Sequence, residues 1–118
     1  MNIEDFREYC LAKKGVSEEL PFGPEYLVFK VMGKIFAITS LESFESVNLK
    51  CDPEEAVALR ERYDSVLPGF HMNKKHWNTV LMDGSIPNKL FLKWVDHSYE
   101  QVVQTLTKKQ KEELKSLS

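Results

Sequence analysis

Chemically versatile side chains gather between Pro68 and Val80 of this chain. These thirteen positions hold two histidines, two lysines, two asparagines and two aromatic residues, and no acidic residue occurs between Ser65 and Met82. Positive charge combined with aromatic rings is the chemistry by which proteins bind single-stranded nucleic acid. The segment therefore predicts either contact with a partner or a structural role within the fold.

Trp77 supports both interpretations. Because Trp77 and Thr79 are two residues apart, they would share one face of a strand. In the structural interpretation Trp77 fills the core and Thr79 makes a cross-strand hydrogen bond. In the functional one Trp77 is a stacking surface beside Lys74 and Lys75, and neighbouring asparagine and lysine side chains address bases or phosphates. Both roles are compatible if the tryptophan is internal and the turn before it is external.

Metal binding and catalysis find little support in the residue spacing. His71 and His76 are five residues apart, and no HxxxH, CxxC or HExxH spacing occurs. Cys51 ends an alternating segment and is expected to point inward, where a thiol is inert packing. A catalytic or sensing pocket would need His71 or His76 to meet Asp83 or Cys51. We therefore expect no metal, no cofactor and no enzymatic activity.

The elements that position these residues follow from hydrophobic periodicity. Helices are expected to begin at Asn2, at Asp52 and after Pro87, with a break near residues 96–98 and a last short helix capped by Thr107. A loop is expected over residues 16–24. Five strands are expected at residues 25–31, 34–39, 46–51, 70–72 and 76–82, giving a two-layer α+β fold with an antiparallel five-stranded sheet. Clean alternation in the third strand indicates one wetter face.

That wetter face is a second candidate surface. Lys30, Asn48 and Lys50 point outward in the expected strands, and Lys34 lies at the rim of the expected hairpin. If the helices cover only the other face, these side chains form a basic patch. The alternative is a plain solvated sheet.

Bulk composition narrows the classes of protein. The 118 residues suit one domain, spanning 1–118, and a hydrophobic share of 42% suffices for a core. A net charge of −2 counts against a dedicated nucleic-acid binder, although a local patch decides binding. No signal pattern or membrane-length apolar stretch is present. We expect a cytoplasmic protein without a membrane partner and with Cys10 and Cys51 reduced.

Six short motifs occur in a fixed order along the chain. They are ELPFGP (residues 19–24), LVFKV (27–31), GKIFA (33–37), PGFHMNKKHW (68–77), DGSIP (83–87) and DHSY (96–99). Together they resemble the MmcQ/YjbR family of small bacterial proteins, nearly end to end. The resemblance implies an α+β fold similar to the CyaY and secretion-chaperone arrangement, in the order α-β-β-β-α-β-β-α-α.

The resemblance also implies a DNA-binding role, described for the family as a double-wing module. The residues that match its polar segment are His71, Asn73, Lys74, Lys75, His76 and Trp77, to which the open sheet face adds Lys30 and Lys34. The expected function is thus a non-enzymatic DNA-binding protein. The alternative is a chaperone-like protein-interaction module without nucleic acid, suggested by the open sheet face and the mixed-charge C-terminal helix.

Overall fold

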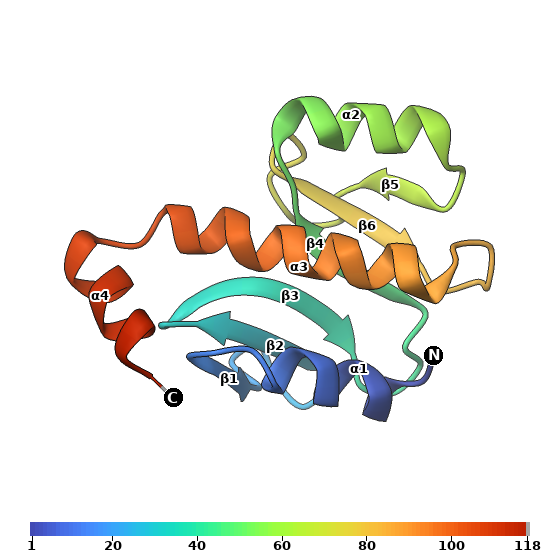
Figure 1. Ribbon diagram of the computed structural model, residues 1–118. Coiled ribbons are helices and arrows are strands. Elements are labelled where there is room, and N and C mark those ends of the chain that lie inside the picture. Colours follow the sequence, from blue (N-terminus) through green and yellow to red (C-terminus); the bar gives the residue numbers. More distant parts are fainter. Residues whose placement is uncertain (118) are drawn as a thin grey trace.

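Six antiparallel strands form one sheet in the computed structural model, which describes residues 1–117 (Figure 1). The strands lie side by side in the order β1-β2-β3-β4-β6-β5. Their bounds are β1 (Val16–Glu19), β2 (Tyr26–Val31), β3 (Lys34–Ser40), β4 (Ser46–Lys50), β5 (Val66–Pro68) and β6 (Trp77–Leu81). Because neighbouring strands are antiparallel, one face of the sheet can be covered while the other stays open.

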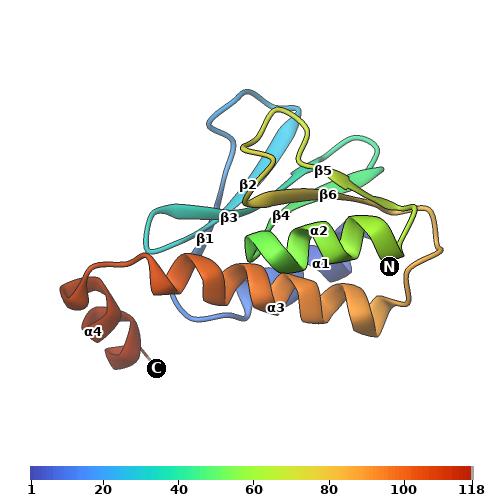
Figure 2. The ribbon, with the colours of Figure 1, turned by 90° about the horizontal axis from the view of Figure 1, so that it is seen from above.

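The helices supply that cover. They are α1 (Ile3–Leu11), α2 (Pro53–Arg62), α3 (Asn88–Gln104) and α4 (Lys108–Ser116), and Figure 2 shows the first three on one face of the sheet. Asn2 accepts a hydrogen bond from the backbone N–H of Asp5, and Asp52 accepts one from Glu55, so the predicted starts of α1 and α2 are confirmed. None of the helices within residues 1–117 combines the length and hydropathy needed to cross a membrane.

The core lies between the sheet and these helices. At its centre, Phe6, Phe29, Phe36 and Phe91 are each at most 1% exposed. The rings of Phe6 and Phe29 meet edge to face with centroids 5.4 Å apart, an arrangement that aromatic quadrupoles favour. Alternate residues of β4 point into this core, as their pattern predicted.

The sheet has six strands, so the prediction of five is wrong in two places. β1 occupies part of the expected loop over residues 16–24, because its backbone pairs with β2 although its sequence carries only one apolar residue, Val16. The short strand expected at residues 70–72 is instead β5, four residues earlier. β5 ends at Pro68; Gly69 still donates its N–H to the carbonyl of Trp77 on β6, and the chain then leaves the sheet in the turns that follow.

α3 is continuous, so the break predicted near residues 96–98 is also wrong. Ser98 does not cap a new helix. Its side chain is fully buried, and its Oγ accepts a hydrogen bond from Lys50 N at 2.8 Å and donates one to Phe36 O. Ser98 therefore ties α3 to the backbones of β3 and β4. Thr107 begins α4 with a capping box, as predicted.

Candidate functional site

The face of the sheet opposite the helices is bordered by two loops, which Figure 2 shows rising on the same side of the molecule. One is the β1–β2 loop (residues 20–25) and the other is the β5–β6 loop (residues 69–76). Between them lies a concave space of about 460 Å³, here called the open-face groove, lined in part by Phe22, Tyr26, Asn48, Phe70 and His71. The groove brings together residues that are far apart in the sequence, such as Phe22 and His71.

Aromatic side chains dominate the walls of the open-face groove. Phe22 is 61% exposed, Phe70 66% and Tyr26 44%. The rings of Phe70 and His71 lie with centroids 4.1 Å apart. Large apolar side chains that gather at the surface mark interaction sites more often than scattered ones do. The arrangement provides flat apolar surfaces in water, suited to stacking.

Hydrogen bonds hold the β5–β6 loop in place over the sheet. Thr79 Oγ1 accepts from the backbone N–H of Phe70 at 2.9 Å, and Asn48 donates to the carbonyl of Phe70 at 3.3 Å. Thr79 also bonds to the side chain of Asn48. Thr79 thus makes the cross-strand bond that the sequence predicted. His71 has φ 59, a conformation that costs a non-glycine residue free energy, so the loop is fixed in a strained form.

The turn at the tip of the loop is open to solvent, as the sequence predicted. Asn73, Lys74 and Lys75 are exposed. Within residues 1–117 neither lysine takes part in an ion pair. The ammonium of Lys74 donates to the carbonyl of Gly69 at 3.2 Å, and Arg60 from α2 donates to the carbonyl of Lys74 at 2.9 Å. Arg60 is therefore a third cation beside the turn, one that the sequence did not point to.

Trp77 lies on the open face of β6, where it is paired with Lys50 of β4. It is partly buried and is not part of the core cluster, so the interpretation that it fills the core is wrong. Trp77 packs against Gly69 so closely that a Cβ on that glycine would lie 2.7 Å from the Cβ of Trp77. His76, also partly buried, precedes it and accepts a backbone hydrogen bond from Cys51.

Lys30 and Lys34 do not join the basic turn. The ammonium of Lys30 lies 3.3 Å from a carboxylate oxygen of Glu19 on β1, so its charge is paired. Lys34 donates to the carbonyl of Thr105 at 3.0 Å, which directs it toward the end of α3. Of the two alternatives for the open face, a basic patch or a plain solvated sheet, the partners of these two lysines favour the solvated sheet.

Two of the groups that a catalytic pocket would need, Asp83 and Cys51, have shifted pKa values. Asp83 accepts hydrogen bonds from the side chains of Ser65 and Ser85 and from the backbone N–H of Ser85, and these lower its pKa to about 2. Burial raises the pKa of the Cys51 thiol to about 12, which disfavours the nucleophilic thiolate. No cluster of three or more metal-ligating side chains occurs in the described part of the chain.

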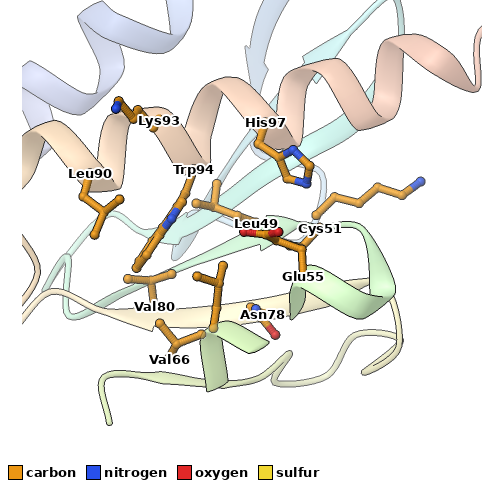
Figure 3. Close-up of a pocket in the computed structure, with 12 residues that line it drawn as sticks. Leu49, Cys51, Glu55, Val66, Asn78, Val80, Leu90, Lys93, Trp94 and His97 are labelled. Carbon is orange, nitrogen blue, oxygen red and sulfur yellow. The ribbon is translucent and has the colours of Figure 1, made fainter. Parts of the chain in front are cut away.

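A second concave site, the helix-side cavity, lies between α2 and α3 against the covered face of the sheet (Figure 3). It measures about 340 Å³, and its lining includes Asn78, Trp94 and His97. The sequence did not reveal it. The one available signal was the inward position of Asn78 in a strand whose other inward residue, Val80, is apolar.

The fold and the groove define a class, namely a small α+β domain whose antiparallel sheet is covered by helices on one face and presents aromatic loops on the other. The chain belongs to the YjbR family, because the family model described as YjbR matches residues 11–101. This confirms the resemblance drawn from the six motifs.

Individual relatives agree with this assignment. YjbR of Escherichia coli K12 is 36% identical over 118 residues, which cover 99% of this chain and 100% of that protein. YbdF of Escherichia coli O157:H7 is 42% identical over 90 residues, covering 75% of this chain and 74% of the relative. Both are described as uncharacterised proteins. The crystal structure of the Deinococcus radiodurans protein DR2400, with the domain DUF419, matches 96% of this chain and 87% of its own at a TM-score of 0.89 and 37% identity.

Proposed function

We propose that this protein is a non-enzymatic DNA-binding protein that holds single-stranded DNA in the open-face groove. Bases would stack on Phe22, Tyr26 and Phe70, and the backbone phosphates would lie against Lys74 and Lys75. The observation that carries the proposal is that one loop, already fixed in place, presents both an exposed aromatic ring, Phe70, and two solvent-exposed lysines.

Stacking and charge act together in such a site. A base stacked on an aromatic side chain contributes about 1–3 kcal/mol, whatever its identity, because every base has a π-face. Lysines that neutralise phosphates release counterions, which adds affinity at low salt. Since the groove offers stacking surfaces but no row of base-reading donors, the expected binding is weakly specific in sequence.

Negative charge at the β1–β2 loop limits the affinity for DNA. Glu25 is exposed at the end of the β1–β2 loop, and the whole chain has a net charge of −2. Carboxylates and phosphates are both negative, so the phosphates of a duplex laid across both loops would be repelled by Glu25 on one side. A single strand has its bases free to stack and can approach the Lys74–Lys75 side. We therefore expect single strands to bind more tightly than duplexes.

Fluorescence anisotropy with a labelled oligonucleotide of ~20 nucleotides, single-stranded or annealed, tests the proposal at two salt concentrations. Changing Phe22 and Phe70 together to alanine should weaken single-strand binding by about 10-fold or more, since two stacking surfaces are removed. Changing Lys74 and Lys75 to glutamate should also weaken it and lower the salt slope by about 0.7 for each phosphate that is no longer neutralised.

The matched control changes Lys108 and Lys109 to glutamate. Both are exposed on α4, away from the groove, and the change in net charge is the same. Equal weakening by the control would mean that overall charge, and not the groove, governs binding. A dissociation constant above ~1 mM at low salt would contradict the proposal outright, because even non-specific binders exceed that affinity.

A second candidate is a protein partner on the same face. It is favoured by the aromatic rather than basic character of the groove, since exposed aromatic anchors dominate protein interfaces. The variants separate the two candidates. Loss of a partner in the Phe22 and Phe70 variant but not in the Lys74 and Lys75 variant would favour protein binding, whereas loss in both favours nucleic acid.

A further inference from the structure

We infer that a cleft between α2 and the tip of the β5–β6 loop binds a phosphate monoester, namely the terminal phosphate of a single strand held in the open-face groove. This cleft, here called the basic cleft, is open to solvent and measures about 750 Å³. Its lining includes Arg60 of α2 together with Lys74 and Lys75 of the loop. The inference rests on the proposed function and adds which part of the strand this chain recognises.

Three cationic side chains meet at the basic cleft. The guanidinium of Arg60 donates a hydrogen bond to the carbonyl of Lys74 at 2.9 Å, which ties the helix to the turn. The ammonium of Lys74 donates to the carbonyl of Gly69 at 3.2 Å. Both groups carry further N–H donors. Within residues 1–117 none of the three cations, Lys75 included, takes part in an ion pair, so their charge is available to an anion.

The balance of charge favours a doubly charged anion. Glu54 is the one carboxylate among the described residues that line the basic cleft, so the three cations leave an excess of two positive charges. A phosphate monoester carries a charge of about −1.5 to −2 at pH 7, whereas each phosphodiester of a DNA backbone carries a single negative charge. Arginine can also bind two phosphate oxygens at once, which lysine cannot. The basic cleft therefore suits a terminal phosphate better than a backbone phosphate.

The basic cleft and the open-face groove are joined by the β5–β6 loop. Phe70 and His71 line the groove, and Lys74 and Lys75 line the cleft a few residues later. A strand whose base stacks on Phe70 can thus continue over the tip of the loop. Among the described residues the cleft offers no aromatic ring on which a further base could stack. It can hold a phosphate but not a stacked nucleotide, so we expect the strand to end there.

Short oligonucleotides test the inference, because a strand of about six nucleotides keeps both ends near the groove. Strands of one sequence carry a phosphate at the 5′ end, at the 3′ end or at neither end. Each displaces an internally labelled strand from the full chain, and fluorescence anisotropy gives its affinity. We expect a phosphate at one end to tighten binding by about 5-fold or more, and a phosphate at the other end to have a much smaller effect.

Variants of α2 assign the effect to the basic cleft. Arg60→Gln removes the charge but keeps an amide that can donate to the carbonyl of Lys74. It should bring the affinities of the strands with and without the terminal phosphate to within about 2-fold of each other. A purely structural role of Arg60 would weaken both strands and leave their ratio unchanged.

Arg62→Gln is the matched control, because it makes the same change of charge on α2 outside the lining of the cleft. It should retain the preference for the phosphorylated strand. Glu54→Gln should increase that preference, because it removes the carboxylate that repels the phosphate.

The outcomes separate this inference from the proposed function. Strands that bind with no gain from a phosphate at either end, or with equal gains at both ends, would overturn the inference and leave the proposed function standing. If no strand binds, the proposed function fails, and inorganic phosphate is titrated into the ¹⁵N-labelled chain instead. Shifts of the Lys74 and Lys75 amide resonances that Arg60→Gln abolishes would then support a phosphate site with free phosphate as its source. Their absence would overturn the phosphate site as well.

Discussion

Alternate residues of β6 lie on the covered face and on the open face of the sheet. Comparing the two faces distinguishes side chains that stabilise the fold from side chains that can bind a partner. Asn78 and Val80 face the helices and are at most 2% exposed, whereas Trp77 and Thr79 belong to the open face. On the covered face, aromatic rings are buried and packed. On the open face, rings of the same kind stand in water beside a turn with two exposed lysines. Burial drives folding, so exposed rings that do not contribute to it are available for a partner.

Truncating one phenylalanine on each face tests this comparison most directly. Phe36→Ala should lower the free energy of unfolding by about 3–5 kcal/mol, because it removes a fully buried ring and leaves a cavity. Phe70→Ala should change it by less than about 0.5 kcal/mol, because that ring is 66% exposed. Urea denaturation followed by circular dichroism measures both. Comparable losses in the two variants would show that the open-face ring is structural.

Ser98→Ala tests how the helices are fixed to the covered face. The serine hydroxyl satisfies the backbone N–H of Lys50 and the carbonyl of Phe36, and alanine would leave both buried groups short of a partner. We expect a loss of about 1–3 kcal/mol in the same denaturation assay. Ser116→Ala is the control, because its exposed hydroxyl bonds only within its own helix. A loss no greater than that of the control would mean that the apolar packing of α3 alone sets its position.

The same comparison explains what the sequence could predict. Residues of the covered face are mainly apolar, so β4 was predictable from its alternating apolar residues. The starts of α1, α2 and α4 were predictable from their capping residues. β1 was not, because an edge strand held by backbone pairing needs few apolar residues. The offset between the apolar residues before and after residues 96–98 predicted a helix break, but α3 continues there and the Ser98 hydroxyl is satisfied by the backbones of neighbouring strands.

The site was predictable only where it is local in sequence. The exposed turn at residues 73–75 follows from a run of polar residues without acids. Phe22 and Tyr26 were missed, because they meet Phe70 only through the order of strands in the sheet. The pairing of Lys30 with Glu19 was missed for a related reason, since it depends on β1 forming at all.

His71→Gly sharpens the difference between the faces by relieving strain in the open-face loop. Histidine at φ 59 is disfavoured, whereas glycine adopts this conformation readily. Removal of the imidazole ring and the added freedom of the unfolded chain oppose this gain, so stability should change by less than about 1 kcal/mol. The loop should nevertheless become more mobile. ¹⁵N relaxation of residues 69–76 measures this, and unchanged order in the variant would show that the hydrogen bonds to Phe70 suffice to hold the loop.

The smallest expected effect concerns the pH dependence of stability at the end of β6. Asp83, just after β6, is hydrogen-bonded to Ser65 just before β5, and these bonds lower its pKa from 3.8 to about 2. A carboxyl with a lowered folded-state pKa stabilises the fold when the pH is above its unfolded value. That contribution is lost as the pH falls from about 4 toward 2.

Asp83→Asn should therefore flatten the acid limb of the stability curve between about pH 4 and pH 2, as measured by thermal unfolding across that range. Asp64→Asn is the matched control, because Asp64 is an exposed neighbour that receives no side-chain hydrogen bond within residues 1–117. An equal flattening in both variants would assign the acid sensitivity to general charge. An effect confined to Asp83→Asn would show that the serine bonds pin the end of β6, and with it both faces that this strand serves.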